Sequence, residues 1–280
     1  MRFFLLLLFI HQGVLSQNTS LLWEVTKEGM KDTSYLYGSI HFPQKALVNA
    51  NKKLHEIKFK VDAGCFEIIL TPDSMAYFSY SLMAGKGDKV NDLFSKKDAK
   101  RIFDYFSDNL EMEELMVDNF IPIGLSSFAL MSFFTKDTTN AIDVLLQNDF
   151  KALGKPLLSL ESIRQQVVLF SQTPMEAQKK ELLAVINNPD SVKKELDLLK
   201  EIYLRQDIDS LYSIVSNSAS EGVFDKERMN SDRNLKMIKK MPYLMRDQSV
   251  LFCIGAAHLG GDKGLINLLR ENGFQVTPIR

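Results

Sequence analysis

Short hydrophobic runs mark both ends of the chain, and a long stretch with helical periodicity lies between them. The runs at 21–26, 34–40 and 61–70, and those at 249–254 and 274–279, are rich in β-branched and aromatic residues, which is typical of strands. Strand-rich ends around a helical middle predict an α/β (α+β) protein. We expect a central mixed β-sheet built from the N- and C-terminal regions.

The middle of the chain, from about 72 to 248, has apolar residues every three or four positions, which predicts a series of helices. One of them is expected over 141–153, because a glycine follows at position 154. A brief strand is expected over 156–160. We therefore predict a single domain over 17–280, in which the helical stretch is an insertion that caps the sheet.

The first residues have the pattern of a secretory signal peptide. Arg2 precedes a short apolar core, and Val14 and Ser16 occupy the −3 and −1 positions of a cleavage site before Gln17. No later run approaches the roughly 20 apolar residues that a membrane-spanning helix needs. We expect an exported protein, periplasmic or secreted, with a signal peptide over 1–16 and no stable membrane anchor.

Composition excludes some partners and leaves other questions open. The formal net charge is −1, and basic residues are spread among acidic ones, so nucleic acid is not an expected partner. Cys65 and Cys253 both lie in apolar runs. They are either a disulfide pair, as export would permit, or two buried free thiols. The oligomeric state is left open.

Two of the four histidines share a four-residue frame. Residues 38–41 read Gly-Ser-Ile-His, residues 255–258 read Gly-Ala-Ala-His, and each frame closes a predicted strand. If the two strands lie in one sheet, His41 and His258 emerge at the same edge. Paired imidazoles there suit a metal site or an acid–base site. The alternative is two unrelated histidines in the core or in loops.

Glu67 is a carboxylate inside an otherwise apolar run near the end of the third predicted strand. A buried carboxylate costs several kcal/mol unless it is paired or binds a metal. Ligand sites in open α/β sheets gather at the carboxyl ends of strands. We therefore expect Glu67 to meet the two histidines, although exposure on the outer face of an edge strand is the alternative.

Three further residues have a weaker pattern. Glu161 follows the brief strand over 156–160, where it serves either the site or the dipole of the next helix. Arg233 lies on a predicted helix, and an arginine there is usually solvated. His55 is expected on a helix surface, away from the site.

These segments, in this order along the chain, resemble the TraB/GumN family. The matching segments are Trp23-Glu24-Val25, residues 34–41, Glu67, residues 154–156 with Glu161 and Gln165, Arg233-Asn234 with Met237, and residues 255–259 with Gly264 and Gly273-Phe274. The family includes pheromone-shutdown proteins and the animal Tiki proteins, which are metal-dependent proteases. It is similar to the erythromycin-esterase and ChaN-like group.

The resemblance implies that His41, Glu67 and His258 bind a metal or act on substrate, and it gives Arg233 a role in the site. The expected function is exported, metal-dependent hydrolysis of a peptide bond in a small peptide or an exposed polypeptide terminus. Both histidines would be ligands, with Glu67 as third ligand or general base, and Arg233 or Glu161 would orient substrate. Zinc, manganese and cobalt all suit such a set.

Two other functions remain open at this point. The same cleft would serve a protein that captures a small peptide without cutting it. A histidine acting as base would also serve metal-free ester hydrolysis. Peptide turnover separates the first from a hydrolase, and resistance of activity to a chelator favours the second.

Overall fold

A computed structural model describes residues 20–42, 52–134, 141–218 and 230–280. The expected signal peptide over 1–16 lies outside the described residues.

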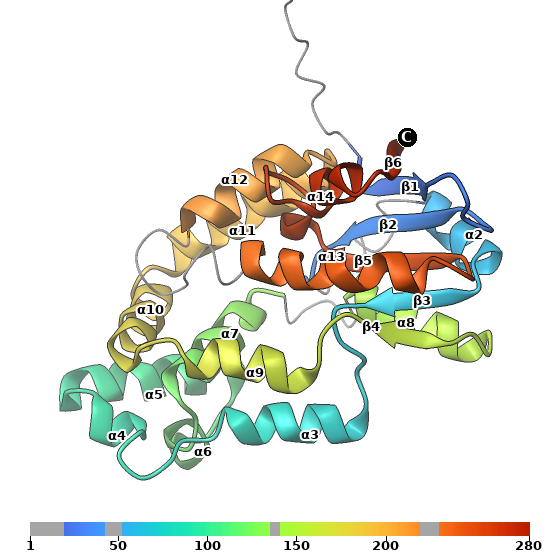
Figure 1. Ribbon diagram of the computed structural model, residues 1–280. Helices are drawn as coiled ribbons and strands as arrows, with labels where there is room; N and C mark the ends of the chain where they lie inside the picture. The colour runs from blue at the N-terminus through green and yellow to red at the C-terminus, as the bar shows by residue number, and fades with distance from the viewer. Residues whose placement is uncertain (1–19, 43–51, 135–140, 219–229) are drawn as a thin grey trace, which may run out of the picture.

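One six-stranded sheet forms the centre of the fold, in the strand order β4-β3-β5-β2-β1-β6 (Figure 1). Its strands are β1 (Leu22–Thr26), β2 (Ser34–Ser39), β3 (Ala63–Phe66), β4 (Leu157–Ser159), β5 (Val250–Gly255) and β6 (Gln275–Ile279). All six coincide with predicted strands. The mixed sheet, drawn from both ends of the chain and covered by helices, confirms the predicted fold class.

Four neighbouring strands, β4, β3, β5 and β2, run parallel, whereas β1 is antiparallel to both β2 and β6. Parallel strands bring their carboxyl ends to one edge of the sheet. The residues that end these four strands are Ser159, Phe66, Gly255 and Ser39. The strands that precede Glu67, His258 and His41 are therefore neighbours at that edge, as predicted.

Helices account for most of the remaining described residues. They are α2 (Lys52–Lys60), α3 (Pro72–Ser81), α4 (Val90–Leu93), α5 (Lys96–Leu110), α6 (Glu114–Asp118), α7 (Pro122–Ser132), α8 (Ile142–Ala152), α9 (Ile163–Ser171), α10 (Met175–Asn187), α11 (Pro189–Leu204), α12 (Ile208–Ser218), α13 (Asp232–Leu244), the 3-10 turn η3 (Ala256–His258) and α14 (Leu265–Glu271). Within the described residues, none is long and apolar enough to cross a membrane.

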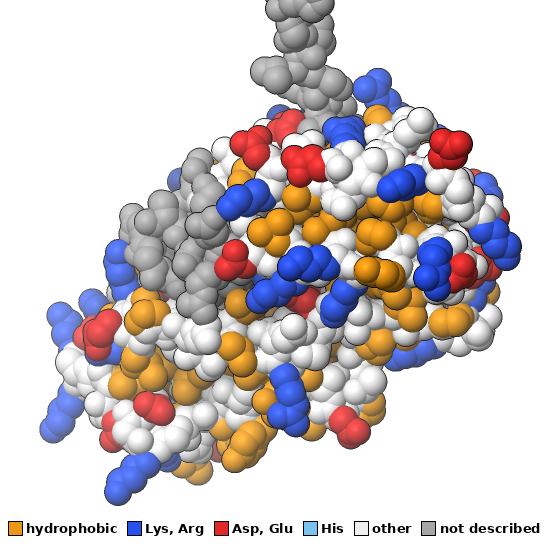
Figure 2. All heavy atoms as spheres, viewed as in Figure 1, with side chains coloured by type: hydrophobic (Ala, Val, Ile, Leu, Met, Phe, Trp, Pro, Cys, Tyr) orange, Lys and Arg blue, Asp and Glu red, His pale blue; other side chains and the backbone are white. Residues whose placement is uncertain are grey.

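Helix α13 lies in front of the sheet in Figure 1, while α2 and α8 lie behind it. Met237 and Met241 of α13 are fully buried in the main core, whereas Lys236 and Lys239 are exposed. This spacing is that of an amphipathic helix. Figure 2 shows Lys and Arg side chains among hydrophobic ones on the same face of the molecule.

A second hydrophobic core lies among α4, α5, α6, α7 and α10, apart from the core around the sheet. Figure 1 shows this helical group beside the sheet rather than over its full face. The stretch from 72 to 248 is therefore not uniform, because β4 joins the sheet and α13 packs on it. The proposed boundaries of the insertion remain a prediction.

The two cysteines are buried, free thiols. Cys65 pairs in register with Phe252, so Cys253, the next residue along β5, projects from the opposite face of the sheet. The register of two neighbouring strands thus decides between the alternatives that the sequence left open.

Candidate functional site

The ends of β3 and β4 bring two glutamates together. Strand β3 ends at Phe66, so Glu67 follows the strand rather than lying inside it, as the predicted run over 61–70 had placed it. The parallel pairing continues past the strand ends, because the backbone N–H of Glu161 donates to the carbonyl oxygen of Glu67 at 2.8 Å. Both side chains are buried. Two carboxylates thus lie side by side at the carboxyl edge of the sheet.

Arg233 binds both of these carboxylates. Its Nε donates to Glu161 Oε1 at 2.9 Å and its Nη2 to Glu161 Oε2 at 2.6 Å, a forked pair that suits the planar guanidinium. Its Nη2 also donates to Glu67 Oε2. Arg233 is 8% exposed and belongs to the buried stripe of α13. The expectation of a solvated helix-surface arginine is therefore wrong, whereas the site role implied by the family resemblance fits this position.

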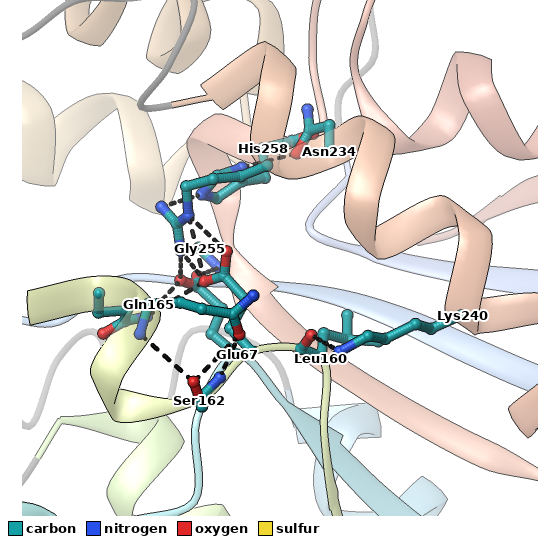
Figure 3. A network of polar contacts seen from close by, with 11 residues as sticks. Glu67, Leu160, Ser162, Gln165, Asn234, Lys240, Gly255 and His258 are labelled. Carbon is teal, nitrogen blue, oxygen red and sulfur yellow. Dashed lines mark hydrogen bonds and ion pairs between the residues drawn. The ribbon is translucent and has the colours of Figure 1, made fainter. Parts of the chain in front are cut away.

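His258 completes this cluster in one defined tautomer. Arg233 Nη1 lies 2.9 Å from His258 Nε2, and a guanidinium only donates, so Nε2 is the acceptor. His258 Nδ1 then carries the proton and donates to Asn234 Oδ1 at 2.7 Å. The Asn234 amide nitrogen donates to the carbonyl oxygens of His258 and Lys263 at 3.0 and 2.8 Å, which fixes the amide orientation. Figure 3 shows Asn234 beside His258, above Glu67.

The charges of the cluster shift the pKa values of its members. Burial and the Arg233 charge lower the pKa of His258 to about 4, against an opposing effect of Glu67, so the ring is neutral at pH 7. Burial alone would raise the pKa of Glu67, but His258, Arg233, His41 and the Gly255 N–H together lower it to about 2. Glu67 is therefore ionised at pH 7. Glu161 and Glu67 in turn raise the pKa of Arg233, against the effect of burial.

The glycines of the two Gly-x-x-His frames each leave space that a Cβ would fill, but for different neighbours. The Gly255 N–H donates to Glu67 Oε1 at 2.8 Å, and a Cβ on Gly255 would lie 3.1 Å from that oxygen. A Cβ on Gly38 would lie 3.1 Å from Ala256 in the other frame. Each glycine thus permits a close approach, one to a carboxylate and the other between the two frames.

His41 has a different environment from His258. Its Nδ1 lies 3.2 Å from Asp143 Oδ2, and its side chain is 64% exposed. Reduced hydration lowers the pKa of His41, but the Asp143 carboxylate outweighs it and the pKa is raised to about 9. The His41 ring is thus in contact with solvent, and neighbouring protein atoms also reduce its hydration. Strand β2, which precedes His41, pairs with β5, which precedes His258, so both histidines follow neighbouring strands at the same edge of the sheet.

The structure therefore brings together four of the predicted site residues and sets one apart. Glu67, Glu161, Arg233 and His258 form one buried hydrogen-bonded cluster, called the Arg233 cluster below. His41 instead pairs with Asp143. His55 lies on α2 and, within the described residues, takes no part in the hydrogen bonds of the Arg233 cluster.

Three residues near the predicted site residues were not predicted from the sequence. Asn234 shares the apolar stripe of α13, and this spacing is a signal that it faces inward. Gln166 lies on the first turn of α9, after the capping box of Ser162 and Gln165, and its amide is 3.4 Å from both glutamates. Nothing in the sequence marks Asp143, whose Oδ1 is buried without a hydrogen-bond partner among the described residues.

The predicted metal ligands do not fit a metal ion as they are arranged. No group of three His, Cys, Asp or Glu side chains among the described residues has the geometry to hold one. The lone pair of His258 Nε2 and an oxygen of Glu67 both face Arg233. His41, the third predicted ligand, contacts Asp143 instead.

A buried ion cluster and an accessible histidine thus lie at the carboxyl ends of parallel strands in an α/β fold. A sequence model of the TraB/PrgY/gumN family matches residues 21–278. The chain therefore belongs to the TraB/PrgY/gumN family. No curated protein and no solved structure matches it.

Proposed function

We propose that this protein is an exported hydrolase that cleaves a peptide bond at the carboxyl edge of the sheet. The single observation that carries the proposal is the accessible His41 ring, paired with Asp143 at the same sheet edge as the buried Arg233 cluster. Family membership and the resemblance to its protease members support the peptide as substrate. The N-terminal pattern over 1–16 supports export.

His41 is the group assigned to proton transfer. With Nδ1 held by Asp143, Nε2 is left to accept a proton from the attacking water and to return it to the leaving amine. Water adds to the carbonyl carbon, the C–N bond breaks, and the products are a carboxylic acid and an amine. Because a base acts in its unprotonated form, activity should rise with pH through the His41 pKa near 9.

The Arg233 cluster serves as a rigid wall of this site. Its members hold one another through charged hydrogen bonds, so their positions change little when substrate binds. The aromatic ring of Phe42, the residue after His41, stacks on that of Phe134 with centroids 4.7 Å apart. Phe134 is buried, so the half-buried Phe42 is the ring that would offer an apolar surface for a substrate side chain next to the reacting group.

The resemblance also implies a divalent metal. Because the predicted ligands face Arg233 and Asp143, we assign no step of the reaction to a metal. The assay therefore tests separately whether activity depends on a metal. The wild-type protein is incubated with a mixture of synthetic peptides, with EDTA or with added Zn²⁺, Mn²⁺ or Co²⁺, and products are identified by mass spectrometry.

Cleavage that is lost in His41→Gln and kept in His55→Gln supports the proposal. Peptides that stay intact in every arm but co-purify with the protein overturn it in favour of a peptide-binding protein. Turnover of p-nitrophenyl acetate without peptide cleavage overturns the peptide substrate and indicates ester hydrolysis. In Asp143→Asn the alkaline rise of the pH profile should move toward pH 6.5.

A further inference from the structure

Two carboxylates and an imidazole meet at the centre of the Arg233 cluster, and these are the donor types of a zinc-like site. The group between them is a guanidinium. Arg233 contacts Glu161 through Nε and Nη2, Glu67 through Nη2, and His258 through Nη1. The donor set that a metal would use is therefore already bound to a cation.

We propose that the Arg233 guanidinium is the resident cation of this cluster and occupies the place that a divalent metal would need between Glu67, Glu161 and His258. The inference concerns the assembly of the site, so it holds or fails independently of peptide hydrolysis.

The direction of the lone pairs is the first argument. A metal would need the Nε2 lone pair of His258, and this lone pair points at an N–H of Arg233. The other ring nitrogen carries a proton that Asn234 accepts. Since Asn234 is held in turn by two backbone carbonyls, the ring cannot offer Nδ1 to a metal without breaking these bonds.

Charge balance is the second argument. Arg233 supplies one positive charge in direct contact with the carboxylates of Glu67 and Glu161. Two carboxylates and one guanidinium leave at most one net negative charge, whereas a divalent ion carries two positive charges. A buried divalent ion beside Arg233 would leave excess positive charge, which is costly in a poorly hydrated site.

The position of Arg233 on its helix is the third argument. It lies on the same stripe of α13 as Met237 and Met241, which are fully buried in the main core. The Cα of Arg233 is therefore on the side of α13 that packs against the core, and its side chain is buried rather than directed to solvent. The packing of α13 therefore keeps the guanidinium at the glutamates.

The experiment measures cobalt binding, because Co²⁺ bound to carboxylate and imidazole has a visible absorption spectrum. Wild type, Glu67→Gln and His258→Gln should show the same Co²⁺ content after equilibrium dialysis. Arg233→Ala should gain one equivalent of Co²⁺ together with a Co²⁺-dependent rise in Tm, since metal binds only the folded state. Arg233→Ala/His258→Gln should lose this gain, and Arg246→Ala, which removes an exposed arginine, should resemble wild type.

Two results overturn the proposal. One is a wild-type protein that holds Co²⁺ and loses it in His258→Gln or Glu67→Gln. The other is a folded Arg233→Ala chain that takes up no additional Co²⁺. Where Arg233→Ala fails to fold even with Co²⁺ present, the comparison of wild type with His258→Gln decides, because it does not require that variant.

Discussion

His41 and His258 end the same four-residue frame, yet the fold gives them opposite properties. His258 is buried and neutral, accepts from Arg233 and donates to Asn234. His41 is accessible, faces Asp143 and has a raised pKa. A local motif thus delivers both histidines to one edge of the sheet, but residues from other elements decide their charge.

The register of β2 and β5 contributes to this difference. Ser39 pairs with Gly255, so the two frames are offset by one residue in the sheet. After Gly255 the chain turns at once into the 3-10 turn η3, whereas no helical turn follows Ser39 before residue 42. The two histidines therefore leave the edge of the sheet along different backbone paths.

The largest expected change in stability comes from removing Arg233, the cation of the buried cluster that contains His258. Arg233→Ala leaves two buried carboxylates without their partner, which should lower the free energy of unfolding by about 3–5 kcal/mol. Urea unfolding measures this loss. The exposed Arg246→Ala should change it by less than about 0.5 kcal/mol. A loss of similar size in both variants would contradict the role of the Arg233 cluster.

A smaller loss is expected when His258 is released from its fixed tautomer. Asn234→Ala leaves the His258 Nδ1–H and two backbone carbonyls without their partner. Buried polar groups left without a hydrogen-bond partner lower the free energy of unfolding by about 1–3 kcal/mol. Asn109→Ala is the control, because Asn109 is exposed and donates to a carbonyl of its own helix. An unchanged urea midpoint in Asn234→Ala would show that the amide does not hold the ring.

The free energy of unfolding measured at acidic pH should depend on the protonation of His258. Its pKa falls from 6.5 to about 4 on folding, so the unfolded chain binds more protons between these values. The contribution of His258 to the free energy of unfolding is therefore fully present above pH 6.5 and is lost as the pH falls toward 4. His258→Gln should flatten this part of the curve, while His55→Gln should keep it. Parallel curves for wild type and His258→Gln would refute the neutral, buried state.

His41 should show the reverse dependence with the smallest effect on stability. Its raised pKa contributes stability below pH 6.5 that is lost as the pH rises through about 9. Asp143→Asn should bring the His41 pKa toward 6.5, as followed by NMR. Because the ring is largely exposed, the free energy of unfolding should change by no more than about 1 kcal/mol.

The control for this last variant lies on the same helix. Asp149→Asn removes an ion pair with Lys58 and should leave the His41 pKa near 9. If Asp149→Asn moved the pKa as far as Asp143→Asn does, the shift would come from the general field of α8 rather than from the contact with Asp143.

Much of this architecture was predictable from local patterns. The six strands and the helix over 141–153 follow from periodicity and from breakers such as Gly154, since both act within a few residues. The position of Glu67 at a strand end and the two Gly-x-x-His frames located the carboxyl edge of the sheet. These features are properties of short segments, which a sequence shows directly.

Only the tertiary structure decided how the candidate residues are paired. Asp143 and His41 are about a hundred residues apart in the sequence and belong to different elements, so no spacing rule joins them. Arg233 meets both glutamates because α13 packs its apolar stripe on the sheet. Strand order, a one-residue register offset and the packing of one helix set these contacts, and each depends on the whole chain folding around a common core.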